Sequence, residues 1–156
     1  MNPRIDLNAQ LSSPALKAML GLQHVVQTSG LEHSLVSLVK IRASQINGCA
    51  YCIDMHTKDA RAEGETEQRI YALNAWRETP FFSDRERAAL EWAETLTLIS
   101  QNQVPDEIYD RVREYFNEKD LISLTMAVIA INAWNRLAIT FRAPAGSYKR
   151  PEAVSV

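Results

Sequence analysis

The chain's two cysteines, Cys49 and Cys52, are separated by two residues, and His56 follows four residues after the second. If the chain is helical from Ala50 onward, spacings of three and four place the three side chains on one helix face, with both sulfurs in the first turn. The positive end of a helix and a neighbouring imidazole both favour the thiolate, which is the reactive form of cysteine. The pattern therefore predicts thiol redox chemistry.

Gly48, directly before the first cysteine, permits a sharp turn out of a preceding helix. The cysteine pair would then lie where two helices meet and backbone N–H groups are free. The spacing also permits a disulfide across one helical turn, so that an oxidised cysteine can be captured by its neighbour and recycled by a dithiol. We expect the pair to support a complete redox cycle.

His56 is the candidate proton acceptor, because a neutral imidazole one turn beyond Cys52 could take the thiol proton directly or through one water. The alternative is a histidine that only packs or hydrogen-bonds at the surface. The spacing of His56 from the cysteines favours the first interpretation.

A metal site is the main competing interpretation of the same residues, since two thiolates and an imidazole are zinc ligands. His24 or His33 could supply a fourth ligand, but neither stands at a recognised ligand spacing and there is no second Cys-x-x-Cys. Covalent haem attachment needs a histidine directly after the second cysteine, where this chain has Ile53. The flanks also lack the βαβ pattern of a thioredoxin fold. We therefore expect no metal and no cofactor.

Composition narrows the class of protein and the partners. The 156 residues suit one domain, and 46% hydrophobic and 23% charged residues are ordinary for a globular protein. A net charge of -2 lacks the basic footprint of nucleic-acid binding. No secretory signal and no segment apolar enough to span a bilayer are evident, which predicts a cytoplasmic protein with no membrane partner. Structural disulfides are rare in the cytoplasm, so the cysteine pair is a functional signal.

Apolar residues recur at helical spacing along almost the whole chain, with no alternating strand pattern. This predicts an all-α domain of about seven helices over residues 1–142, and a flexible tail or inter-subunit arm over 143–156. Capping patterns at Thr66 and Ser83 mark two helix starts. The predicted breaks are Ser29-Gly30, Asn47-Gly48, Glu63-Gly64, Thr79-Pro80, Gln103-Val104-Pro105 and Ala143-Pro144.

The segment 121–141 is apolar on more than one face, which predicts a central buried helix or an oligomer contact. Asn132, Asn135 and Arg136 interrupt it. Because buried polar groups need partners, these side chains either form internal hydrogen bonds or line the site, and we favour the structural role.

The run from Val39 to His56 resembles the AhpD-like alkylhydroperoxidase branch of the carboxymuconolactone decarboxylase family. The resemblance continues through Gly64-Glu65-Thr66, Trp76-Arg77-Glu78, Glu86-Arg87-Ala88-Ala89-Leu90 and Asn132-Ala133-Trp134-Asn135-Arg136, and covers about residues 15–142. It implies an all-helical fold, homotrimers or homohexamers, and reduction of hydroperoxides at the expense of a dithiol protein or small thiol. It also implies that Cys52 is the peroxidatic cysteine and Cys49 the resolving one.

One departure concerns the family's proton relay, which places a glutamate twelve residues before the first cysteine, where this chain has Ser37. A histidine sometimes found between the cysteines is Tyr51 here. The relay is then either shortened to His56 and water or completed by another residue, for which His33 and the carboxylates Glu91 and Glu94 are candidates.

Two other functions stay open. A non-enzymatic redox sensor or stress-response subunit could use the same disulfide to change its assembly. The decarboxylase or lactone chemistry of the wider family relies on no cysteine pair and would leave both cysteines unexplained.

Overall fold

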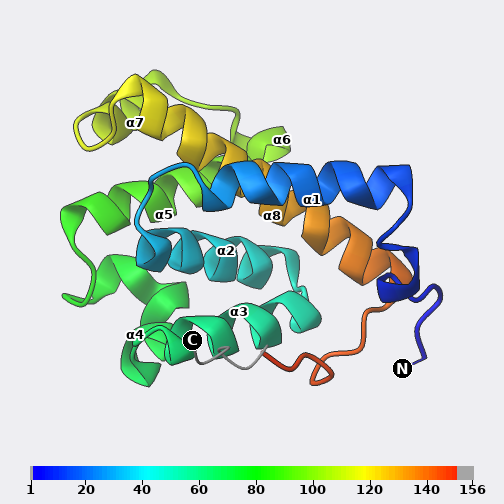
Figure 1. Cartoon of the computed structure of the whole chain (residues 1–156). Coiled ribbons are helices and arrows are strands. Elements are labelled where there is room, and N and C mark those ends of the chain that lie inside the picture. Colours follow the sequence, from blue (N-terminus) through cyan, green and yellow to red (C-terminus); the bar gives the residue numbers. More distant parts are fainter. Residues whose placement is uncertain (1, 151–156) are drawn as a thin grey trace, which may run out of the picture.

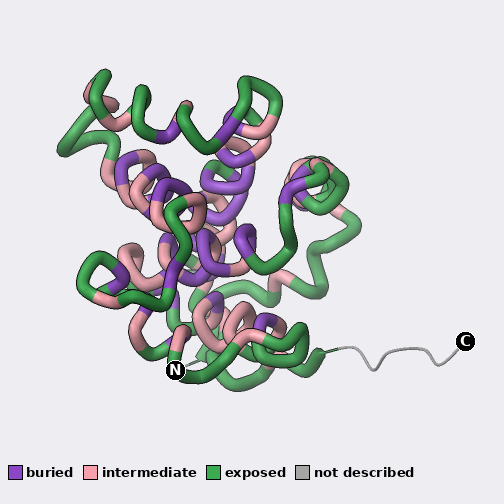
Figure 2. The backbone as a smooth tube through the Cα atoms, turned by 90° about the vertical axis from the view of Figure 1, so that its left-hand side faces the viewer, coloured by how far each residue is buried: buried purple, intermediate pink, exposed green. Residues whose placement is uncertain are grey.

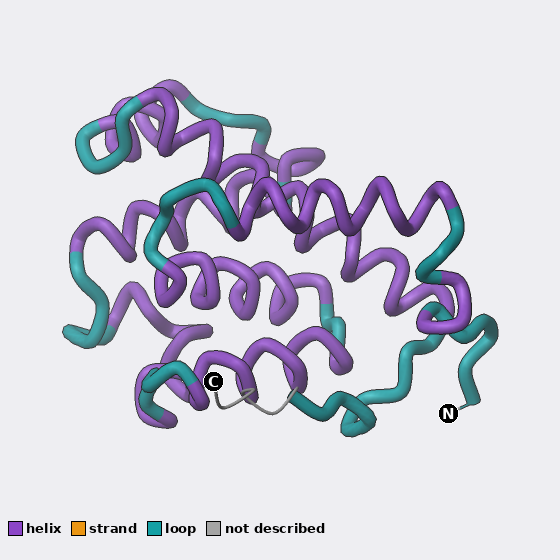
Figure 3. Tube along the Cα trace, viewed as in Figure 1, coloured by secondary structure: helices purple, strands orange, loops and turns teal. Residues whose placement is uncertain are grey.

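The computed structural model describes residues 2–150 and is helical throughout, with no strand in that part of the chain (Figure 3). This confirms the predicted all-α class, with eight α-helices where about seven were expected, together with two short 3₁₀ helices. The elements are η1 (Asn8–Gln10), α1 (Pro14–Gln27), α2 (His33–Asn47), α3 (Ala50–Ala62), α4 (Glu67–Ala72), η2 (Leu73–Glu78), α5 (Asp84–Thr97), α6 (Ile99–Asn102), α7 (Asp106–Arg113) and α8 (Glu118–Phe141) (Figure 1).

Side chains cap several helix starts, as the sequence predicts at two of them. Thr66 caps α4 by accepting the Arg69 N–H at 3.2 Å, and Ser83 forms a complete capping box with Glu86 at the start of α5. Asn117 caps α8 in the same way, accepting from the Asp120 N–H at 2.9 Å. The break between α7 and α8 at this asparagine was not predicted.

Helix α2 lies in the middle of the molecule, in contact with α3 on one side and with α5 and α8 on the other (Figure 1). Its apolar residues serve two cores: Leu35 and Val39 pack with α5 and α8, whereas Leu38 and Ile41 pack with α3, α4 and η2. The buried stretches of chain gather in the interior of the molecule and exposed ones at its periphery (Figure 2). Burial on both sides makes α2 a rigid platform for the helix that follows it.

Helix α8 is both a core helix and a surface helix. Residues such as Leu124, Val128 and Ile131 are almost fully buried, while Ile122 and Ile129 are exposed. By length and mean hydropathy α8 passes the test for a membrane-spanning helix, contrary to the expectation that no segment would. The core helix of a globular domain passes the same test, and α8 packs against α1, α2, α5 and α7.

An amide network ties the end of α2 to α8. The Asn47 side chain donates to the carbonyl oxygens of the Asn132 and Asn135 side chains at 3.0 and 2.8 Å, and Asn135 donates to Ser44 Oγ at 3.0 Å. Arg136 donates to the Asn132 backbone at 2.9 Å. The side chains of Asn132 and Asn135 therefore form internal hydrogen bonds, the structural role favoured from the sequence, whereas Arg136 is exposed.

Gly48 ends α2 in the left-handed conformation, with φ of 68°. Its N–H donates to the Gln45 carbonyl at 3.2 Å and the next N–H, that of Cys49, donates to the Ser44 carbonyl at 3.0 Å, which is the Schellman pattern. A residue with a Cβ is strained in this conformation, so glycine is the natural choice.

We predict that Gly48→Ala lowers the free energy of unfolding by about 1 kcal/mol, because alanine pays the left-handed penalty. Gly21→Ala is the matched control: Gly21 is exposed within α1, and a Cβ there meets nothing within 4 Å, as at Gly48. Alanine at Gly21 should instead stabilise by roughly 0.5–1 kcal/mol. Urea denaturation checks both, and equal shifts of the same sign would contradict the prediction.

Candidate functional site

Cys49 and Cys52 form a disulfide at the start of α3, with their Cα atoms 5.4 Å apart. Cys49 is the N-cap residue of α3, and its sulfur accepts the Cys52 N–H at 3.4 Å. Both residues are buried, at 1% and 2% exposure, in a small cluster with Ala138 of α8. The positive end of a helix is thus directed at Cys49, which favours a thiolate there once the disulfide is reduced.

A cavity of about 570 Å³ adjoins the pair. Cys52 lines this cavity and Cys49 does not, so the two sulfurs differ in their access to a ligand. The lining residues are Pro3, Ile5, Asp6, Leu7, Asn8, Leu11, Leu20, Gln23, Tyr51, Cys52, Met55, His56, Trp134, Ala138, Ala143, Pro144 and Ser147. Most of these side chains are apolar or aromatic, as in sites for small organic molecules.

Segments near both ends of the described chain form part of the lining of this cavity. The N-terminal segment is fixed by Arg4, whose N–H and guanidinium donate to the carbonyls of Phe141 and Thr140 at 2.9 and 3.1 Å. Residues 143–150 leave α8 and run along α3 (Figure 1). Their assignment to a flexible tail or an inter-subunit arm stays a prediction, and residues 151–156 lie outside the described chain.

His56 lines the cysteine cavity and also a second cavity of about 380 Å³. The second cavity is the more polar: it contains Lys40, Asp59 and Glu63, and also Ser37 and His33 of α2. The imidazole, together with Met55, therefore lies between an apolar space that reaches Cys52 and a polar space that reaches ionisable groups. That position suits a group that passes a proton from one side to the other.

Burial, and to a lesser extent the charge of Lys40, together lower the pKa of His56 from 6.5 to about 3. The imidazole is thus neutral while the pair is a disulfide. Burial also lowers the pKa of Lys40, against the opposing charges of Asp59 and Glu63. Lys40 was not singled out from the sequence; its place three residues after Ser37 on a buried helix was the one available signal.

The other relay candidates are divided between the cavities. Tyr51 lines the cysteine cavity, and burial raises the pKa of its hydroxyl. Ser37 and His33 share the polar cavity with His56, and both also line a third cavity of about 490 Å³ beside Arg69. The structure thus brings Ser37 and His33 together with His56, but not into the cavity that holds Cys52.

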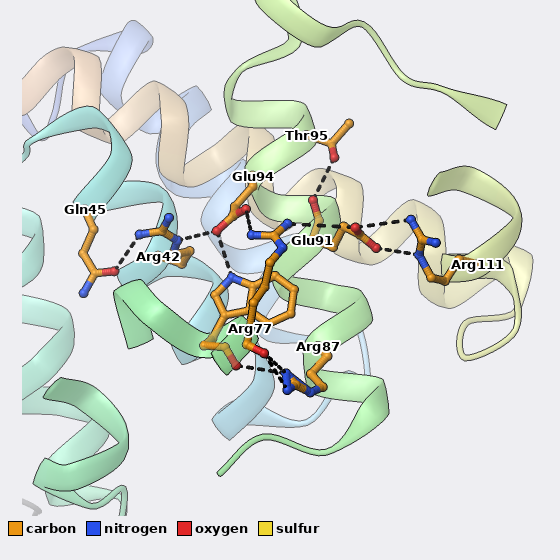
Figure 4. Close-up of polar contacts among 9 residues, drawn as sticks. Arg42, Gln45, Arg77, Arg87, Glu91, Glu94, Thr95 and Arg111 are labelled. Atoms are coloured by element: carbon orange, nitrogen blue, oxygen red, sulfur yellow. Dashed lines mark hydrogen bonds and ion pairs between the residues drawn. The ribbon is translucent and has the colours of Figure 1, made fainter. Parts of the chain in front are cut away.

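Glu91 and Glu94 lie elsewhere, in an ion-pair cluster between α2, η2, α5 and α7 (Figure 4). Glu94 accepts from Arg42 at 2.7 Å and from Trp76 Nε1 at 2.8 Å, and it also pairs with Arg77. Although burial alone would raise the pKa of Glu94, these hydrogen bonds hold it below its ordinary value. The carboxylate is committed to arginines and serves the packing of α2 against α5.

Glu91 is held in the same cluster by Arg111 of α7, whose guanidinium donates to it at 2.8 Å (Figure 4). Neither glutamate lines a cavity with the cysteines or with His56. Sequence reasoning on carboxylates that could approach the site therefore missed Asp59 and Glu63, which do lie in the cavity beside His56.

Trp134 of α8 is a further residue of the cysteine cavity that sequence reasoning did not assign a role. Its indole N–H is buried and has no hydrogen-bond partner within the described residues, whereas Trp76 and Trp92 donate to Glu94 and Thr125. Over residues 2–150 no group of three histidine, cysteine or acidic side chains is placed to hold a metal ion.

Comparison with known proteins identifies the family. Residues 14–95 match the model of the carboxymuconolactone decarboxylase family. The uncharacterized protein YdfG of Bacillus subtilis is 48% identical over 130 residues, 83% of this chain and 88% of its own length.

Two solved structures extend the match. ATU0492 of Agrobacterium tumefaciens, a protein of unknown function described as an AhpD-type antioxidant defence protein, is 41% identical with a TM-score of 0.89, over 94% of this chain and all of its own. A peroxidase-related protein with an AhpD core from Ralstonia eutropha has the same fold at 18% identity, with a TM-score of 0.78 over 93% of this chain and 77% of its own. The chain therefore belongs to the carboxymuconolactone decarboxylase family, and within it to the AhpD-like branch.

Proposed function

We propose that the protein is a thiol-dependent peroxidase that reduces organic hydroperoxides through Cys49 and Cys52. The observation that carries the proposal is the asymmetry of the pair: the two cysteines join as a disulfide, yet only Cys52 lines the cavity. The AhpD-like membership of the chain agrees with this chemistry, as does the description of ATU0492, whose function is unknown, as an AhpD-type antioxidant defence protein.

In the proposed cycle the Cys52 thiolate attacks the terminal oxygen of the peroxide. The O–O bond breaks, an S–O bond forms, and the alcohol leaves with a proton, so that Cys52 becomes a sulfenic acid. Cys49 then attacks the Cys52 sulfur, water leaves, and the disulfide forms. Two thiol groups of a dithiol protein or of small thiols return both electrons and complete the cycle.

His56 would move the proton rather than store it. With a pKa of about 3 beside a neutral disulfide, the imidazole is too weak a base to hold a thiol proton at neutral pH. A thiolate at Cys52 would raise the pKa of His56, because an opposite charge nearby favours the protonated ring. The polar cavity on the other side of His56 is lined by the carboxylates of Asp59 and Glu63, which are acceptors to which the proton can pass. This route uses no carboxylate at Ser37.

The cavity favours a peroxide with an apolar body. Ile5, Leu11, Leu20 and Met55 offer hydrophobic contacts to such a ligand. A cytoplasmic location, where thiol reductants are abundant, is part of the same proposal.

The redox-sensor alternative uses the same disulfide but differs in turnover. A sensor consumes one equivalent of peroxide and changes its association state, whereas the enzyme consumes many when a reductant is supplied. The decarboxylase alternative predicts lactone turnover that survives replacement of both cysteines.

We also propose a homo-oligomer, a trimer or hexamer. Ile122 and Ile129 lie two turns apart on one face of α8 and are 65% and 48% exposed. Such an apolar stripe on a long helix is typical of a contact between subunits.

Cysteine variants test the chemistry. Cys52→Ser should abolish peroxide consumption, because it removes the nucleophile. Cys49→Ser should consume a single equivalent and leave a sulfenic acid on Cys52, which dimedone traps and peptide mass spectrometry locates. Trapping on Cys49 instead, or unchanged consumption in both variants, would show that the assigned roles are wrong.

We expect the oxidised protein to keep His56 neutral at pH 5, since burial opposes its charge. The contribution of His56 to stability should fall as the pH drops below 6.5, because the unfolded chain then binds a proton that the folded site excludes. Lys40→Met should raise the pKa of His56 by removing the like charge. Lys119→Met, at an exposed position in the first turn of α8, is the control and should not. Histidine NMR titration measures this, and protonation of His56 near pH 6.5 in the parent protein would refute it.

For the assembly, Ile129→Glu should reduce the molar mass measured by light scattering on a sizing column, because it buries a charge in the proposed contact. Ile99→Glu on α6 is the control, since Ile99 is 51% exposed and lies outside the α8 stripe. A monomeric parent protein, or equal masses for the parent and Ile129→Glu, would be evidence against the contact.

A further inference from the structure

The oxidised pair poses an access problem for any reductant. Thiol–disulfide exchange requires the attacking sulfur to reach a disulfide sulfur directly, and both cysteines are almost fully buried. Cys52 can be approached only through its cavity, and Ala143, Pro144 and Ser147 form part of the cavity wall. A small thiol fits a space of about 570 Å³, but the surface of a protein dithiol does not.

Residues 143–150, which we call the strap, are held on α3 by polar contacts. The Gly146 N–H donates to Asp54 at 3.1 Å, and Lys58 donates to the Tyr148 carbonyl at 3.2 Å. The Tyr148 hydroxyl donates to Asp59 at 2.9 Å, and Asp59 lines the polar cavity beside His56. Burial and the hydrogen bond to Asp59 raise the pKa of Tyr148 to about 12, so this donor keeps its proton through the neutral range.

The strap is built to detach. No residue of the strap is fully buried, and only Ala143 and Tyr148 are partly buried. Arg142, where α8 ends, has φ of 58°, so the chain turns sharply before the strap begins. A segment with few buried apolar contacts and exposed hydrogen bonds opens locally at low cost, while the helices beneath it stay folded.

We propose that the strap is a gate over the Cys49–Cys52 disulfide, which admits small thiols when closed and a protein dithiol only when it lifts from α3. The inference rests on the proposed function only in assigning a thiol reductant to the pair.

The exchange step itself follows from which sulfur faces the cavity. The reductant thiolate attacks the Cys52 sulfur, the disulfide bond breaks, and Cys49 leaves as a thiolate at the N-terminus of α3, where the helix stabilises it. The second thiol of the reductant then attacks the mixed disulfide. It releases the Cys52 thiolate and leaves the reductant oxidised, so two electrons enter the protein.

The test compares the rates at which thioredoxin, as a protein dithiol, and dithiothreitol, as a small one, reduce the disulfide. The chain shortened to end at Arg142 lacks the strap, and the chain shortened to end at Arg150 is the matched control. Quenching with acid followed by thiol alkylation and mass spectrometry gives both rates. We expect loss of the strap to raise the ratio of the thioredoxin rate to the dithiothreitol rate by about tenfold or more, the effect of roughly one net hydrogen bond. The control should keep the parent ratio.

The full-length double variant Tyr148→Phe, Lys58→Met removes two strap contacts without shortening the chain and should raise the same ratio. It decides the question if the chain ending at Arg142 does not fold. An unchanged ratio in the double variant and in any folded strap-free chain overturns the gate. Because no peroxide is used, failure of the peroxidase proposal would appear in the cysteine variants and not in this measurement.

Discussion

The left-handed turn at Gly48 is the constraint on which the site depends. It lets the chain pass from α2 into α3 within two residues, so that the Cys49 N–H still bonds to α2 while the Cys49 sulfur already caps α3. Asn47, one residue earlier, is bonded to α8. The disulfide therefore lies in a short α2–α3 connection that is fixed by contacts with α2, α3 and α8. The two sulfurs meet without rearrangement of these helices. A more mobile α2–α3 connection would let the two sulfurs move apart and would slow formation of the disulfide.

Much of this α2–α3 connection can be predicted from the sequence, because it depends on interactions between residues that are close together in the chain. A glycine before Cys-x-x-Cys predicts the turn, and the spacing of three and four predicts the shared face. Ser83 and Thr66 mark helix starts through capping chemistry that acts within one turn. Asn117 carries the same signal before α8, but with neither glycine nor proline nearby the break was missed. Spacing gives no information about partners far along the chain, so Glu94, paired with an arginine 52 positions away, was wrongly considered for the relay.

The surroundings of His56 are a property of the site that short-range sequence patterns do not predict. Its spacing from Cys52 indicates a proton acceptor, yet the pKa of the ring is set chiefly by burial between two cavities and then by the charge of Lys40 of α2. The chain thus combines a neutral, poorly solvated imidazole with an adjoining polar cavity that is lined by ionisable groups. Such a group responds to the charge state of the sulfur: beside a disulfide it stays uncharged, and beside a thiolate it gains affinity for a proton. The proton and electron states of the site are thereby coupled through a single ring.

The segments near the two ends of the described chain line the cysteine cavity but carry neither of the reactive cysteines. Residues 3–11 and 143–147 shape the cavity, whereas the helices α2, α3 and α8 hold the disulfide and its proton path. Substitutions in the ends can therefore enlarge, narrow or polarise the pocket while the packed interior stays intact. Because of this division, related proteins could evolve to bind different small molecules through changes in these two segments, while the helical core and its folding stay the same.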